Sequence, residues 1–308
     1  MTPILLGVLP VFALIALGWG LKASGFIPAE TWAPIERIAY FVFYPGFLVP
    51  TIWAAQFEGL SSAPLGLASV GAVLLIGAAA VLAKPLTGFS GPAFASVFQG
   101  MTRWNSFVFL PVVVAVFGEA GLARAAVVIG ALVPVINIMA VLAHVRWGEG
   151  QREAGGGLRA AGRALGRNPI LWSCGIGLLL NLLRVPPGPV DDSLDLLGDG
   201  ALALGLLVAG AGLNFAAAAA RPVTIAAVCA VKLVLMPVLM WGLCRLFGGD
   251  LLSQGVALAC GSAPGAAASY VLARQMGGDA PLMAGIVAFT TLASVATIPL
   301  LLLAFGLP

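Results

Sequence analysis

Charged residues are scarce in this chain. Asp, Glu, Lys and Arg make up 9% of its 308 residues, whereas 61% are hydrophobic, and a typical soluble domain carries about 25% charged residues. A water-soluble fold of this composition would expose large apolar patches. The mean hydropathy of +1.07 therefore predicts a protein embedded in a lipid bilayer, which is its first expected partner.

Residues that usually build catalytic and metal sites are also scarce. The chain has 1 histidine, His144, and 4 cysteines without a C-x-x-C pair, so we interpret the cysteines as small buried hydrophobic residues. The apolar runs contain no G-x-S-x-G motif, and the one pair of carboxylates within a run, Asp195 and Asp199, lies near the start of the seventh run, which argues against a membrane-embedded enzyme. We expect no catalytic residue, no metal site and no cofactor. Without a basic stripe interleaved with aromatic residues, we also expect no nucleic-acid partner.

Apolar runs of membrane-spanning length recur ten times along the chain. They cover residues 3–21, 33–56, 64–83, 93–117, 122–145, 169–184, 193–214, 222–247, 252–275 and 281–306. The first run has no basic segment before it, so we interpret it as a retained helix rather than a cleaved signal. The sequence predicts an all-α membrane protein with a first five-helix repeat at 1–147, a cytoplasmic loop at 148–168 and a second five-helix repeat at 169–308.

The two halves show internal similarity. GEAGL at 118–122 precedes the fifth run, GDAPL at 278–282 precedes the tenth 160 residues later, and the same register places Asn137 opposite Thr297. Each half has an odd number of crossings, so the second must be inserted upside down relative to the first. Such an inverted repeat is typical of secondary transporters. Lys and Arg are concentrated in the loops after the odd-numbered runs, which predicts that these loops are cytoplasmic and that both termini lie outside.

One proline in each half interrupts a run of membrane-spanning length. Pro111 lies in the fourth run and Pro264 in the ninth, and each removes a backbone donor and clashes with the carbonyl four residues earlier. We expect both helices to be broken at these prolines, and paired interruptions indicate a transporter binding site. The plain alternative is that both are ordinary kinks and that Asn105 bonds a neighbouring helix. The paired placement favours the site.

Polar residues accompany both prolines. Half-helices that begin there would direct their positive N-terminal ends towards the membrane centre, which suits an anion. The candidate substrate-binding residues are Asn105, Ser106, Pro111, Pro264, Gly265, Ser262, Arg103, Lys232, Asn137 and Thr297. Arg103 is equally expected to reach the cytoplasmic face or to attract an anion. Asn137 and Thr297 are more readily explained as contacts between helices.

Lys232 lies near the middle of the eighth run, where a charge costs about 2.5–3.5 kcal/mol. It therefore needs a partner or a wet cavity. We expect it either to stabilise carbonyls freed at an interruption or to pair with an anionic substrate. The alternative is a lysine that reaches the membrane interface.

Several segments together resemble the auxin efflux carrier family. They are LPVFALIALGWGLKASGFIP, RWNSFVFLP, NPILWSCGIGLLL, VKLVLMP and APGAAASYVLARQMGGDAPL, and the resemblance spans nearly the whole chain. It implies two inverted repeats in which broken helices 4 and 9 cross, elevator-like transport of organic anions by efflux or exchange, and a homodimer in a bacterial inner membrane. It also implies that Asn105 touches the substrate carboxylate.

The coupling ion stays open at this point. Neither broken run contains a carboxylate, so a charged sodium site is not evident, and proton coupling or uniport is at least as consistent with the sequence. A sodium-coupled organic anion symporter of the bile-acid-carrier type is the alternative function, and a membrane-embedded enzyme is the less favoured one.

Overall fold

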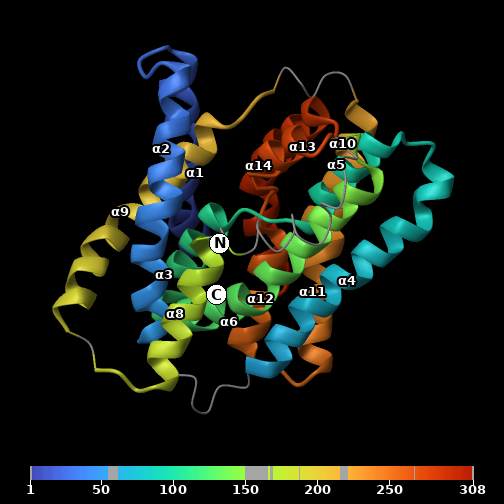
Figure 1. The fold of residues 1–308 in the computed structure, drawn as a ribbon. Coiled ribbons are helices and arrows are strands. Elements are labelled where there is room, and N and C mark those ends of the chain that lie inside the picture. Colours follow the sequence, from blue (N-terminus) through green and yellow to red (C-terminus); the bar gives the residue numbers. More distant parts are fainter. Residues whose placement is uncertain are drawn as a thin grey trace.

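The computed structural model describes residues 2–54, 62–149, 166, 169–186, 188–215, 221–266 and 268–306, and within these residues every regular element is a helix (Figure 1). Most are α-helices; η1 is a 3-10 helix, and η2 and η4 are π-helical turns. In chain order the elements are α1 (Thr2–Ala23), η1 (Ala29–Thr31), α2 (Trp32–Ile38), η2 (Ala39–Phe43), α3 (Tyr44–Trp53), α4 (Ser62–Thr87), α5 (Gly91–Thr102), α6 (Ser106–Trp147), α8 (Pro169–Leu182), α9 (Pro189–Ala211), α10 (Pro222–Ala230), η4 (Val231–Leu235), α11 (Met236–Leu246), α12 (Leu251–Ser262), α13 (Ala268–Gln275) and α14 (Ala280–Ala304). Most of the expected loop at 148–168 lies outside the described residues.

Five helical stretches are long and apolar enough to cross a membrane. They are Ala63–Thr87, Gly91–Trp147, Asp192–Ala211, Pro222–Leu246 and Ala280–Ala304, and Leu9–Ala23 and Leu251–Ser262 are shorter apolar helices. The other predicted runs are shorter or divided: the sixth is α8, with 14 residues, and the ninth consists of α12 and α13. The helices support a multi-pass membrane protein, and the count of ten spans stays a prediction.

The fourth and fifth predicted runs are joined more closely than expected. The second part of the fourth run and all of the fifth form α6, without a loop between them. Inside α6, Gly118 has φ 60° and ψ −156°, which marks a sharp turn between two helical parts. A residue with a Cβ atom rarely adopts such angles, so glycine allows the chain to turn within one residue.

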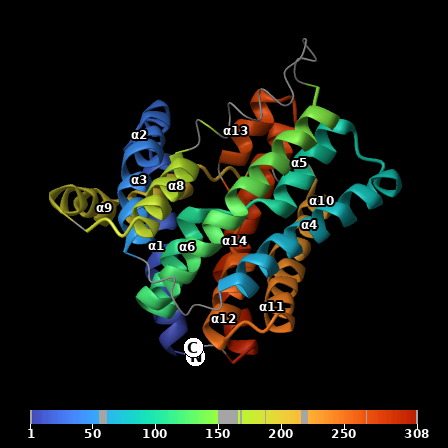
Figure 2. The same ribbon diagram turned by 60° about the horizontal axis from the view of Figure 1, so that its bottom comes forward.

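The helices form two groups on either side of α6. One group contains α1, α2, α3, α8 and α9, and the other contains α4, α5 and α10 to α14 (Figures 1 and 2). The first group is held by a close approach of α1 and α9, where a Cβ atom on Gly18 would lie 2.0 Å from the carbonyl oxygen of Leu207. α6 contacts helices of both groups, so it sits where the two groups meet.

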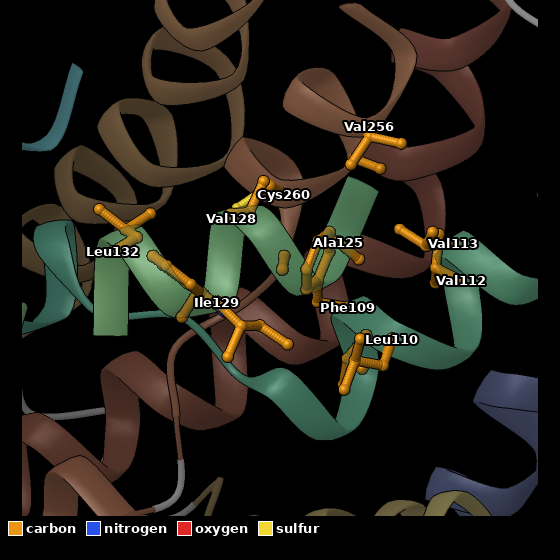
Figure 3. Close-up of a cluster of buried hydrophobic side chains, with 14 of the residues drawn as sticks. Phe109, Leu110, Val112, Val113, Ala125, Val128, Ile129, Leu132, Val256 and Cys260 are labelled. Carbon is orange, nitrogen blue, oxygen red and sulfur yellow. The ribbon is translucent and has the colours of Figure 1, made fainter. Parts of the chain in front are cut away.

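A buried hydrophobic cluster fixes the turn of α6 in place. Figure 3 shows Phe109 and Val113 from the first part of α6 facing Ala125 and Ile129 from the second part. Cys260 of α12 joins this cluster and is fully buried. The core therefore connects the start of α6 to the end of α12, which are the two segments that carry the predicted site.

Candidate functional site

Two helices are interrupted, and their interruptions contact each other. Arg103 to Asn105 are non-helical between α5 and α6, and Ala263 to Ala266 are non-helical between α12 and α13. The backbone N–H of Asn105 donates a hydrogen bond of 2.8 Å to the carbonyl oxygen of Pro264. Each interruption thus satisfies part of the backbone of the other, as buried irregular backbone requires at membrane depth.

The first interruption does not occur at Pro111, so that prediction is wrong. Pro111 is buried inside α6, six residues beyond Asn105, whereas Pro264 lies within the second interruption as predicted. The physical reason is capping: Asn105 starts α6, because its side-chain oxygen accepts from the N–H of Phe107 at 2.9 Å. The two prolines also occupy different places in the internal register, since Trp104 stands 160 residues before Pro264.

The interrupted helices nevertheless correspond in length and position. α5 and α12 have 12 residues each, and α12 begins and ends 160 residues after α5. Their N-caps follow the same register: the side chain of Ser90 accepts from Ala93 N, and that of Asp250 accepts from Ser253 N. The correspondence that the sequence suggested therefore lies in the helices and caps rather than in the prolines.

Asn105 is the most deeply placed polar residue of the first interruption, with 3% of its surface exposed. Its Oδ1 atom must be the one that faces Phe107 N, because a backbone N–H can only donate. The side-chain NH2 group is then the part of Asn105 that a ligand can use, and it is a hydrogen-bond donor. A donor at a helix N-terminus favours an anion. Ser106, which follows, is partly buried.

The polar groups of the second interruption are occupied within the chain. The N–H of Gly265 donates to Thr290 Oγ1 at 3.0 Å, and the hydroxyl of Ser262 donates to the carbonyl of Ala259 at 3.0 Å. Sequence analysis named Gly265 and Ser262 as substrate-binding residues, and this role stays a prediction. It did not single out Thr290 as a partner of Gly265, although Thr290, Ser294 and Thr297 recur at helical spacing along α14.

Lys232 is fully buried in the π-helical turn η4. Its Nζ atom donates to the carbonyl oxygen of Gly261 at 3.3 Å, near the end of α12. The alternative of a lysine that reaches the interface is therefore wrong. The C-terminal end of a helix carries partial negative charge, so the contact fits the first expectation, in which Lys232 stabilises carbonyls beside an interruption.

Arg103 and Asn137 lie together, whereas Thr297 is separate. Nη2 of Arg103 donates to Oδ1 of Asn137 at 3.3 Å, and the amide group of Asn137 donates to Val133 O at 2.8 Å. The Nε atom of Arg103 is buried and has no hydrogen-bond partner among the described residues. Thr297 Oγ1 is likewise buried without a hydrogen-bond partner among the described residues, so no hydrogen bond of this hydroxyl joins it to the other candidates there.

Sequence reasoning missed two buried polar residues beside the first interruption. Gln99 is fully buried in α5, and its Nε2 atom donates to the carbonyl of Ser269 in α13 at 2.8 Å. Tyr44 is fully buried in α3, and its ring centroid lies 4.1 Å from that of Phe107. The sequence did contain a signal for Gln99, because its polar side chain lies in an apolar run one helical turn before Arg103. The approach of Tyr44 depends on tertiary packing and gave no signal.

The outer ends of the interrupted helices are tied to charged residues. Asp279 accepts from Arg221 at 3.3 Å, and its N–H donates to Pro92 O at 3.1 Å near the start of α5. At the start of α12, Arg124 forms an ion pair with Asp250. Partial desolvation raises the pKa of Asp250, but hydrogen bonds from Ser253 and Arg124 outweigh it, so the pKa lies below its usual value.

Comparison with known proteins adds one finding. No curated protein matches the chain. A family model described as membrane transport protein matches residues 158–302, which is slightly less than half of the chain. The matched region contains Lys232 and the second interruption but not the first. Together with the apolar helices, this similarity to membrane transport proteins supports a multi-pass membrane protein of the transport class.

Proposed function

We propose that this protein is a secondary transporter of small organic acid anions, working by efflux or exchange, with the substrate bound where the two interruptions meet. The hydrogen bond from Asn105 N to Pro264 O carries this proposal. It joins two broken helices in the interior of an apolar protein, and broken helices of this kind form the binding sites of secondary transporters. The similarity to membrane transport proteins supports the same class.

We further propose that the two halves form inverted repeats with crossing broken helices. The matching bounds of α5 and α12 support this. The contacts at the outer ends of α5 and α12 support it too. Asp279 of the GDAPL segment donates a backbone hydrogen bond to the start of α5. Arg124, which follows the GEAGL segment, forms an ion pair with Asp250 at the start of α12. In this arrangement each repeat supports the broken helix of the other.

The proposed mechanism is elevator-like alternating access in the bacterial inner membrane, by a homodimer. The division of the helices into two groups supports a movement of α4, α5 and α10 to α14 against α1, α2, α3, α8 and α9. Several helix ends lie together at one side of the protein. Glu149 N, just after α6 and Arg146, donates to Gly277 O before α14 at 2.8 Å, and Asp279 contacts both Pro92 of α5 and Arg221 before α10. By the positive-inside rule we propose that this side is cytoplasmic. The start of α1 and the end of α14 lie together at the bottom of the view in Figure 2. We propose that this end faces the outside.

Uptake by purified protein in proteoliposomes tests the function. A panel of mono- and dicarboxylic acids is offered under imposed pH or sodium gradients, with protein-free liposomes as the control. We expect saturable uptake of at least one acid. Stimulation by a pH gradient would indicate proton coupling, and stimulation by sodium would support the bile-acid-carrier alternative. If no acid is transported under any gradient, the proposal is wrong.

A further inference from the structure

Arg103 occupies the interruption itself, between the end of α5 and Asn105. Its side chain is partly buried, and its guanidinium is oriented by Asn137, which accepts from Nη2 at 3.3 Å. Asn137 is in turn fixed by its bond to Val133 O. The Nε donor is buried and unused by the described residues. Asn137 therefore orients the guanidinium through Nη2, while the Nε donor beside the proposed site stays unsatisfied among the described residues.

The part of the chain that the structure describes gives this guanidinium no ion-pair partner. An arginine side chain stays protonated in proteins, and a buried charge without a partner is costly. Among the described residues no carboxylate lies within 4.0 Å of Arg103. Arg124 and Arg221 differ in this respect, because each pairs with an aspartate. A partner for Arg103 must therefore come from elsewhere.

Lys232, the other buried cation near the interruptions, does not compete for this role. Its Nζ atom already contacts the carbonyl oxygen of Gly261, where the negative end of the α12 dipole balances part of its charge. The two cations thus have separate tasks, one structural and one open to a ligand.

We propose that Arg103, positioned by Asn137, binds the carboxylate of the transported acid. This inference rests on the proposed function and deepens it. The planar guanidinium fork matches a carboxylate in two-point geometry, which a lysine ammonium cannot reproduce. Because a single uncompensated positive charge lies at this place, the site favours acids with one carboxylate over dicarboxylates. Asn105 adds a neutral donor to the same anion.

The test measures both binding and transport in purified wild-type protein and in Arg103→Gln, Arg103→Lys and Asn137→Ala. Benzoate, its neutral isostere benzamide, and succinate are the probes. Arg37→Gln is the matched control, because Arg37 is an exposed arginine of α2. Binding is read as the shift of the thermal midpoint in detergent at increasing probe concentration, and transport as KM and Vmax of uptake in proteoliposomes.

We expect benzoate to stabilise the wild type more than benzamide or succinate does. Arg103→Gln should raise the KM for carboxylates at least about tenfold, as expected when a charged hydrogen bond is lost, and should abolish the preference for benzoate over benzamide. Arg103→Lys should restore the preference for an anion without restoring full affinity, and Asn137→Ala should raise KM less than Arg103→Gln. Arg37→Gln should behave as wild type.

Two results separate the inference from the function beneath it. If the wild type transports carboxylates and Arg103→Gln keeps their KM and the benzoate preference, the role of Arg103 is wrong while the transport function stands. If the wild type neither binds nor transports any acid of the wider panel, the proposed function itself fails. Should Arg103→Gln not fold, Asn137→Ala and Arg103→Lys decide, because unchanged KM values in both would overturn the inference.

Discussion

Gly261 allows the end of α12 to lie directly on α11, and replacing it by alanine should separate them. A Cβ atom at this position would lie 2.4 Å from Cα of Pro237 and 2.7 Å from its nitrogen. Carbon atoms in contact are about 3.5–4.0 Å apart, and backbone atoms cannot turn aside as a flexible side chain can. The end of α12 must therefore withdraw from α11 by about 1 Å or more.

That withdrawal has two energetic consequences. Overpacking of a buried contact costs about 1–3 kcal/mol. The bond from Lys232 Nζ to Gly261 O, already 3.3 Å long, would also break, and a hydrogen bond that involves a charged group contributes about 1.5–3 kcal/mol. The sum is a large part of a typical stability of about 5–15 kcal/mol. We expect Gly261→Ala to lower the thermal midpoint clearly and to reduce transport.

The assay compares thermal midpoints of purified variants in one detergent, followed by size-exclusion chromatography. Gly242→Ala is the control, because a Cβ atom on Gly242 of α11 would meet nothing within 4 Å; it should be neutral or stabilising by up to about 1 kcal/mol. Lys232→Met is added alone and together with Gly261→Ala. If Gly261→Ala breaks the lysine contact, Lys232→Met should cost less in its presence. Equal midpoints for Gly261→Ala and Gly242→Ala would refute this reasoning.

Two further predictions concern the packing of α1 on α9 and the cap of α12. Gly18→Ala and Gly210→Ala should each destabilise the protein, because their Cβ atoms would lie 2.0 and 1.9 Å from backbone oxygens of the facing helix, whereas Gly20→Ala on the same α1 should not; equal thermal midpoints for the three variants would contradict this. The pKa of Asp250 is lowered in the folded protein, so its ionised carboxylate stabilises the fold. This stabilisation is fully present above the usual carboxyl pKa of about 3.9 and is lost as the pH falls below that value. Asp250→Asn, which keeps a capping oxygen, should therefore lose less stability than wild type between pH values of about 6 and 3.5, measured as thermal midpoints; identical pH profiles would exclude this contribution.

Composition and hydropathy were sufficient to predict the class and most helices. The runs at 64–83, 222–247 and 281–306 coincide with α4, with α10 to α11 and with α14, because lipid-facing helices are apolar over their whole length. The junction of α5 and α6 could not be placed in the same way. Proline marked a break at Pro111, but the cap at Asn105 decides where α6 begins.

The partners of the buried polar residues depend on tertiary structure. The sequence identified Lys232 as a charge that needs a partner and Arg103 as a charge that reaches the cytoplasmic face or attracts an anion. It could not show that Lys232 contacts Gly261 or that Arg103 contacts Asn137. These contacts join segments 29 and 34 residues apart. The internal register did carry information: it relates α5 to α12 by 160 residues, which would have placed the first interruption before Asn105 rather than at Pro111.

Asn105→Asp tests most directly whether the meeting point of the two interruptions binds the anion. Aspartate caps a helix as well as asparagine, so α6 should form and the thermal midpoint should stay close to wild type. It replaces the donor NH2 group by a negative charge, however, and like charges repel. We predict that the KM for a transported organic acid rises at least about tenfold, the loss of one charged hydrogen bond. A folded Asn105→Asp variant that transports the acid with the wild-type KM would contradict the proposed site.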